Sequence, residues 1–232
     1  MTRILTLACL FSLCVLDLAC QSGPPEPGQR GNTYAMECNV QKDGSLEVSE
    51  HLTVEAGKEG ITHGVWREFP QEFVGCQGER REFDIQIQDV LRDGEPAQHH
   101  KVALPGTTRL YVGEEGTTLE SARYAYTLKY RTSPVVEIRD GHCWLCWDIV
   151  GEGLTVPLKS LRAEFLLPRS VPAERLQAES SMQPPAEDAD VFDLKVAAGR
   201  VQITSTAVFE AGRTLRARIS WPSSQTGSGG ED

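Results

Sequence analysis

Short runs of residues that alternate between apolar and polar types constrain the fold of this sequence most. In residues 124–130 every second residue is a tyrosine or a leucine, and the residues between them are small or polar. Successive side chains of a β-strand point to opposite faces of the sheet, so this period of two indicates a strand with one buried face. Similar runs, which we also predict to be strands, occupy residues 34–40, 46–54, 65–69, 83–91, 101–104, 108–112, 161–167, 192–196, 201–203 and 215–221. The run 144–150 is apolar on both faces, which is typical of a strand in the middle of a sheet.

Turn signals separate these runs, and no long amphipathic helix interrupts them. Asp43-Gly44 and Asp93-Gly94 each lie between two alternating segments, a pattern typical of β-hairpins. Many short strands joined by turns predict an all-β fold, and we expect an antiparallel β-sandwich of the immunoglobulin-like or a similar type. The stretch 170–190 is rich in Pro, Glu and Ser, and we expect it to form a loop or a short helix.

The N-terminus has the pattern of a secretory signal. The apolar run 4–16 follows a basic residue, and it is shorter than the roughly 20 residues that span a bilayer. It ends in LDLAC, and a small residue before Cys20 resembles a bacterial lipoprotein processing site, at which the cysteine takes a diacylglycerol. We therefore expect residues 1–19 to be a signal peptide and residues 20–31 to be a lipidated cysteine with a Pro/Gly linker. The alternative is an ordinary signal-peptidase cut after Ser22.

Lipidation would make the chain an exported lipoprotein, anchored in a membrane and facing the periplasm or the cell exterior; the alternative cut would make it a secreted soluble protein. Residues 32–222 are expected to form one β-sandwich domain, and 223–232 a disordered polar tail. The net charge is −10, from 33 acidic and 23 basic residues. A field of this sign repels phosphate backbones, so we expect no nucleic-acid partner.

Four cysteines remain after the signal and Cys20 are set aside, namely Cys38, Cys76, Cys143 and Cys146. An even number in an oxidising compartment favours two disulfides. Residues three apart in a strand are about 10 Å apart and point to opposite faces, so Cys143 and Cys146 should each pair with Cys38 or Cys76. Two alternatives remain open: reactive redox thiols, and metal-bound or free thiols.

Aromatic and charged residues gather in two places that are candidates for binding or for structure. Trp66, Arg67 and Phe69 form the first, where an arginine between aromatic rings could hold a carboxylate or stack on a sugar or peptide. We favour a structural role, with the rings in the core and Arg67 in an ion pair. Trp147 and Asp148 form the second, and Asp148 is a candidate partner for Arg67 in a buried pair.

Several segments, taken in order, resemble one known family. They are KDGSLEVSEHLTV (42–54), HGVWREFP (63–70), RLYVG (109–113), YAYTLKYRT (124–132), CWLCWDIVG (143–151) and LLP (166–168). The family is catalogued as domain of unknown function 2207, the exported N-terminal domain of predicted bacterial membrane proteins. The resemblance implies a β-sandwich outside the membrane with no assigned activity. Family members typically continue into transmembrane helices, so attachment here would depend on Cys20.

No catalytic, metal or cofactor site is expected from the remaining residues. The adjacent pair His99-His100 is the nearest approach to a metal motif among the five histidines, and adjacent side chains diverge in extended chain. A nucleophile motif of the Gly-x-Ser-x-Gly type is missing from residues 32–222. We therefore expect a non-enzymatic module that binds an envelope protein or polymer through strand edges and loops. The alternatives are a thiol-active protein that uses Cys143 and Cys146 and, with least support, a hydrolase.

Overall fold

A computed structural model describes residues 31–57, 61–114, 116–168, 171–184 and 191–223 of this chain. The regular secondary structure of the described residues is all β-strand except for one short 3-10 helix at Ala173–Arg175. The strands are β1 (Thr33–Val40), β2 (Leu46–Glu55), β3 (Val65–Pro70), β4 (Glu72–Val74), β5 (Arg80–Glu82), β6 (Ile85–Arg92), β7 (Glu95–Pro96), β8 (His99–Leu104), β9 (Thr107–Val112), β10 (Arg123–Thr132), β11 (Glu137–Arg139), β12 (His142–Val150), β13 (Ser160–Leu166), β14 (Gln177–Gln183), β15 (Phe192–Ala197), β16 (Arg200–Ser205) and β17 (Thr214–Pro222). The predicted all-β class is confirmed.

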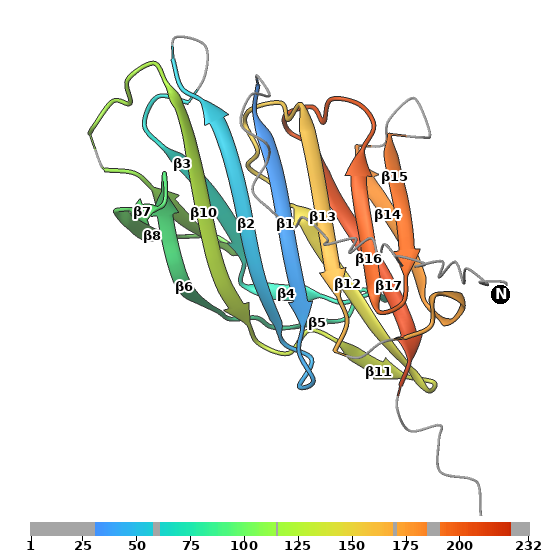
Figure 1. Cartoon of the computed structure of the whole chain (residues 1–232). Helices are drawn as coiled ribbons and strands as arrows, with labels where there is room; N and C mark the ends of the chain where they lie inside the picture. The colour runs from blue at the N-terminus through green and yellow to red at the C-terminus, as the bar shows by residue number, and fades with distance from the viewer. Residues whose placement is uncertain (1–30, 58–60, 115, 169–170, 185–190, 224–232) are drawn as a thin grey trace, which may run out of the picture.

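One long sheet forms the first layer of the fold. Its strand order is β15-β16-β13-β1-β2-β10-β6-β7, and Figure 1 shows these strands side by side across the front of the molecule. β1 and β2 form the hairpin predicted around Asp43-Gly44, and Gly44 takes the positive φ of 81° that such a turn requires. The pairing of β1 with β13 is parallel, whereas every other strand pair among the described residues is antiparallel. The predicted antiparallel β-sandwich is therefore confirmed, with one parallel pair that the sequence did not indicate.

The second layer lies behind the first and is divided. It contains a four-stranded sheet in the order β11-β12-β17-β14, a three-stranded sheet in the order β3-β9-β8, and the two-stranded β4-β5 ribbon. β12 is central in its sheet, as its two apolar faces predicted. β3 and β12 are neighbours in neither sheet, so the second layer is discontinuous between them.

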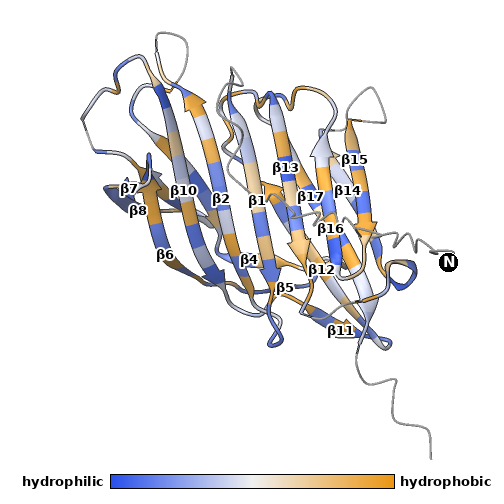
Figure 2. Ribbon diagram, viewed as in Figure 1, coloured by the Kyte–Doolittle hydropathy of each residue, from blue (hydrophilic) through white to orange (hydrophobic). Residues whose placement is uncertain are grey.

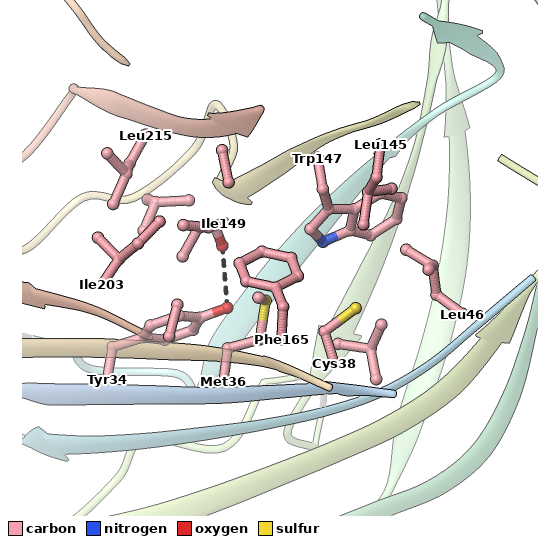
Figure 3. Packing of buried hydrophobic residues seen from close by; sticks show 14 of the residues in the cluster. Tyr34, Met36, Cys38, Leu46, Leu145, Trp147, Ile149, Phe165, Ile203 and Leu215 are labelled. Carbon is pink, nitrogen blue, oxygen red and sulfur yellow. Dashed lines mark hydrogen bonds between the residues drawn. The ribbon is translucent and has the colours of Figure 1, made fainter. Parts of the chain in front are cut away.

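The core fills the space between the two layers. Figure 2 shows hydrophilic and hydrophobic residues alternating along the strands of the long sheet, which is how one face of each strand reaches the core. Figure 3 shows Met36 and Phe165 of this sheet packing toward Leu145 and Ile149 of β12. The hydroxyl of Tyr34 donates a 3.0 Å hydrogen bond to the carbonyl of Ile149 and so joins the two layers within the core.

The stretch 170–190 differs from its prediction. It was expected to be a loop or a short helix, but after the 3-10 helix residues Gln177–Gln183 form β14, which pairs with β17 at the edge of the four-stranded sheet. Its exposure alternates along the strand, and the apolar members of that alternation are only Ala178 and Met182. The weak apolar signal reflects an edge strand with one partner. Residues 185–190 lie outside the described part.

Two glycines fix the contact between the HGVWREFP and RLYVG segments. A Cβ on Gly64 would lie 2.2 Å from the carbonyl oxygen of Val112, and a Cβ on Gly113 would lie 2.6 Å from the carbonyl oxygen of His63. Both residues also have positive φ angles, 115° and 148°. Only glycine fits this approach without strain, and the approach positions β3 against β9.

Candidate functional site

A buried polar cluster lies between the two layers, beside the break in the second one. Arg67 of β3 extends its guanidinium to Glu50 of β2, with Nε 3.1 Å from Oε1, and the side chains are 17% and 6% exposed. The same carboxylate oxygen accepts a 2.7 Å hydrogen bond from the hydroxyl of Tyr130. Burial raises the pKa of Tyr130, and the nearby Glu50 carboxylate raises it further. The buried charges of Glu50 and Arg67 are therefore compensated by each other, and the Tyr130 hydroxyl adds a hydrogen bond to Glu50.

Arg67 thus makes the structural ion pair that the sequence favoured, although its partner was predicted wrongly. The expected pair with Asp148 is not formed, because the Asp148 carboxylate contacts Arg216 of β17 at 2.8 Å. Asp148 instead offers its main-chain carbonyl, which accepts a 3.3 Å hydrogen bond from Nη2 of Arg67. Gly151 leaves room for this side chain, since a Cβ there would lie 2.7 Å from Nη1 of Arg67.

The aromatic residues around Arg67 have separate roles. Phe69 is buried, and its ring packs edge-on against Tyr130 with centroids 5.1 Å apart. Trp66 is half-buried and lies in register with Tyr111 on β9, and the guanidinium of Arg109 lies 5.4 Å from the Trp66 ring centroid. Arg109 also pairs with the carboxylate of Glu68. The predicted motif is therefore divided between the core and the other face of β3.

A groove of about 400 Å³ occupies the break between β3 and β12. β3 contributes residues 67–70 to its wall, and β12 contributes Trp147 and Asp148. Aromatic rings line it as well, since Phe73 and Phe83 have centroids 6.0 Å apart and Phe83 and Trp147 are also 6.0 Å apart. Its volume falls in the range of about 300–1,000 Å³ that is typical of ligand sites. It is a candidate binding site.

One carboxylate of the groove, that of Glu152, is not balanced by an arginine in the described part of the chain. The lining of the groove contains four carboxylates and two guanidinium groups, from Glu68, Glu72, Asp148, Glu152, Arg67 and Arg216. Three of these carboxylates form ion pairs: Glu68 with Arg109, Glu72 with the exposed Arg80, and Asp148 with Arg216. Glu152 is exposed, and no ion pair to it is found in the described part of the chain. Positively charged groups are therefore favoured at the mouth.

The cysteines form one of the two disulfides expected. Cys76, in the loop between β4 and β5, is bonded to Cys146 with Cα atoms 5.2 Å apart. Cys143 packs against the core from the opposite face of β12, so it forms no bridge with Cys146. Cys38 is fully buried among core side chains, and this burial raises the pKa of its thiol. Cys38 and Cys143 are not joined to each other by a disulfide. The prediction of a second disulfide is therefore wrong.

A pair of carboxyl groups ties the disulfide loop to β11. Glu137 of β11 shares a hydrogen bond with Glu79, and the guanidinium of Arg81 lies 3.5 Å from the Glu137 carboxylate. Desolvation by burial, with a further contribution from the Glu79 hydrogen bond and charge, raises the pKa of Glu137 to about 7. Sequence analysis did not predict this pair, because its two members are 58 residues apart. No group of three or more metal-ligating side chains gathers anywhere in the described ranges.

Comparison with known proteins decides the family. Residues 31–221 match the family described as "Predicted membrane protein (DUF2207) N-terminal domain". This chain belongs to the DUF2207 family. The resemblance found in its ordered motifs is therefore confirmed, and HGVWREFP and CWLCWDIVG of this DUF2207 domain supply Arg67, Asp148 and Gly151 to the cluster beside the groove. Within the described ranges, no helix has both the length and the apolar character needed to cross a bilayer.

A curated relative of this DUF2207 domain is YciQ of Escherichia coli (strain K12), which carries the description "uncharacterized protein". The two are 27% identical over 119 residues. The match covers 51% of this chain and 19% of YciQ, so the chain spans only a small part of that relative.

Solved structures that match part of this chain include two hydrolases. Leukotriene A4 hydrolase from Saccharomyces cerevisiae is 9% identical with a TM-score of 0.45, and the match covers 80% of this chain and 28% of the enzyme. An M1 zinc metallopeptidase from Deinococcus radiodurans is 14% identical with a TM-score of 0.40, covering 82% of this chain and 43% of the enzyme. Similarities at this level carry no argument about activity.

Proposed function

We propose that this chain is an exported, lipid-anchored and non-enzymatic binding module of the bacterial cell envelope. The groove between β3 and β12 is the observation that carries the binding role. The charged residues that the sequence singled out near it, Arg67 and Asp148, are held in internal ion pairs. The aromatic lining of the groove is then the part left to a ligand, and we assign no catalytic residue.

The anchoring half of the proposal rests on the N-terminal sequence, where Cys20 follows an apolar run of signal-peptide length. It is tested by growing cells that express the full chain with an alkyne analogue of palmitate. The wild-type chain should incorporate the label and enter the detergent phase of a Triton X-114 extraction. The Cys20→Ser variant should do neither, whereas Cys38→Ser should behave like the wild type. Equal labelling of the wild type and the Cys20 variant would refute lipidation.

The binding half is tested by photo-crosslinking in intact envelopes. A photoreactive amino acid is placed at Thr214, which lines the groove, and in a separate chain at Thr204, which lies on β16 of the long sheet. Both residues are half-buried, so the two positions are matched in exposure. A discrete adduct from position 214 that is missing from position 204 supports a ligand in the groove. Identical adduct patterns from the two positions would contradict it.

The thiol-active alternative has lost the pair on which it depends. It requires Cys143 and Cys146 to react with each other, and the structure bonds Cys146 to Cys76. Cys143 lies on the opposite face of β12, against the core. We therefore keep the binding module as the proposal.

A further inference from the structure

We infer that the groove between β3 and β12 binds an extended peptide segment that carries a basic side chain. This inference deepens the proposed function and rests on it. Three features carry it: two strand edges without a second partner, an aromatic wall, and an unbalanced negative charge at the mouth.

The strand edges come first. In its sheet β3 pairs with β9 alone, so its other edge has no strand partner among the described residues. β12 pairs with β17 along one edge and with β11 along the other, but the β11 pairing ends at Trp144. Beyond that point, in the described part of the fold, the second edge of β12 has no strand beside it. Exposed strand edges are the surfaces to which extended peptides add by main-chain hydrogen bonds.

Both of these edges border the same groove. Residues 67–70 of β3 lie on one wall, and Trp147 and Asp148 of β12 lie on the other. The side chain of Arg67 spans the gap at one end, where it reaches the carbonyl of Asp148. The remaining length of the groove is lined by Phe73, Phe83 and the turn at 105–107. An extended chain would therefore meet polar main-chain edges and aromatic rings together.

The aromatic wall includes a donor that has no acceptor. Trp147 is 6% exposed, and its indole Nε1 makes no hydrogen bond to any described residue. A buried donor left unpaired costs free energy, and such groups in native proteins call for an explanation. The nitrogen atom itself is inaccessible to solvent, so we do not assign it to the ligand, and the wall contributes the apolar surface of its rings.

The charge selects a basic segment. Three of the four lining carboxylates are paired with arginines, Glu152 has no ion pair among the described residues, and the whole chain carries a net charge of −10. Glu152 is exposed at the groove, where a lysine or arginine of the ligand could approach it. Cations also favour the faces of aromatic rings, which this groove supplies. An acidic segment would be repelled by the same groups.

The test uses defined peptides and the purified full chain. The first probe is the capped peptide acetyl-Thr-Val-Thr-Lys-Thr-Val-Thr-amide. In the second probe glutamate replaces the lysine. The third probe keeps the lysine, and the main-chain amide of every second residue is N-methylated. Binding is followed by isothermal titration and by tryptophan fluorescence at 50 mM and 300 mM salt. We expect the lysine peptide to bind at least tenfold more tightly than the glutamate peptide. N-methylation should weaken binding of the lysine peptide by a similar factor, because methylated amides cannot donate hydrogen bonds to a strand edge.

Matched variants locate the site. Glu152→Gln should weaken binding of the lysine peptide by about threefold to tenfold and flatten its salt dependence, whereas Glu174→Gln, at a residue that is also exposed, should have no effect. Thr214→Trp should fill the groove and abolish binding, and Thr204→Trp on the long sheet should leave it unchanged. Thermal melts of all four variants establish that each is folded. Because Glu152 is exposed, its variant gives a readout that does not depend on repacking.

Three results would overturn the inference: equal affinity for the lysine and glutamate peptides, no binding of any peptide at millimolar concentration, or loss of binding in Thr204→Trp as well as in Thr214→Trp. The photo-crosslinking experiment separates this failure from failure of the proposed function. An adduct specific to position 214, together with no peptide binding, would leave a binding module whose ligand is not a basic peptide. Identical adducts from positions 214 and 204 would remove both.

Discussion

Replacing Glu50 with alanine removes one half of a buried ion pair, and its cost can be worked out from the structure. The variant loses the 3.1 Å contact with Arg67 and the 2.7 Å hydrogen bond from Tyr130. The Arg67 side chain, 17% exposed, would keep its hydrogen bond to the carbonyl of Asp148. Leaving a buried charge without its partner costs about 3–5 kcal/mol, so Glu50→Ala should destabilise the fold by about 4 kcal/mol.

A surface ion pair of nearly the same length gives the control. Lys129 lies 3.2 Å from Asp89, but the two side chains are 45% and 49% exposed. Exposed pairs contribute about 0–1 kcal/mol, so Asp89→Ala should cost less than about 1 kcal/mol. The double variant Glu50→Leu/Arg67→Met removes both buried charges. It should be within about 2 kcal/mol of the wild type. The single variants Glu50→Leu and Arg67→Met complete the cycle, and if Glu50→Leu costs about 4 kcal/mol, as Glu50→Ala does, the coupling free energy is roughly 2 kcal/mol or more.

Urea unfolding followed by tryptophan fluorescence, with the disulfide intact, measures these free energies. The reasoning predicts a large loss for Glu50→Ala, a partial recovery in the double variant and almost no change for Asp89→Ala. It would be refuted if Glu50→Ala and Asp89→Ala lost similar amounts of stability. It would also be refuted if the effects at Glu50 and Arg67 were simply additive.

Three further predictions concern residues on or near β11 and β12 of the second layer. Gly151→Ala should lower the free energy of unfolding by about 1–3 kcal/mol in the wild type, because the new Cβ would lie 2.7 Å from Nη1 of Arg67. The loss should be much smaller in an Arg67→Met background. Urea unfolding of the wild type, the two single variants and the double variant checks this. The Cys76–Cys146 bridge closes a 70-residue separation, so its reduction should lower stability by about 2–5 kcal/mol, and peptide mapping without reductant should recover these two cysteines linked. The pKa of Glu137 rises from 4.5 to about 7 on folding, so between those values the folded chain holds a proton that the unfolded chain releases. Stability should therefore fall by about 1–2 kcal/mol as the pH rises from 5 to 8, and Glu137→Gln should flatten this slope in thermal melts.

The strands that the sequence predicts are those with strong apolar alternation. The tyrosines and leucine of 124–130 give β10, and the residues around Asp43-Gly44 give the β1–β2 hairpin. The strands that it misses are β4, β5, β7 and β11, each two or three residues long, together with β14. Three residues are too few to show a period of two, and β14 is an edge strand with small side chains. Strand length and position in the sheet thus decide what a single sequence reveals.

The candidate site was predictable in part. The positions of Arg67 and Asp148 mark the two sides of the groove, but the partner of Arg67 was missed. Glu50 occupies the alternating run of β2 in phase with the buried residues Leu46 and Val48. A carboxylate in phase with a buried face needs a cation, so this phase was the available signal. The remaining step, which arginine reaches it, depends on the packing of two layers and is not encoded in local spacing.

The buried pair also explains why the second layer stays divided. Pairs of this kind add little net stability over apolar residues of the same volume, so stability alone does not account for one here. Arg67 spans the space between β3 and the carbonyl of Asp148, and Gly151 leaves the room that its guanidinium occupies. A side chain therefore stands where main-chain pairing of β3 with β12 would otherwise close the layer. The ion pair to Glu50 holds that side chain in place, and we infer that its chief role is to keep the groove open.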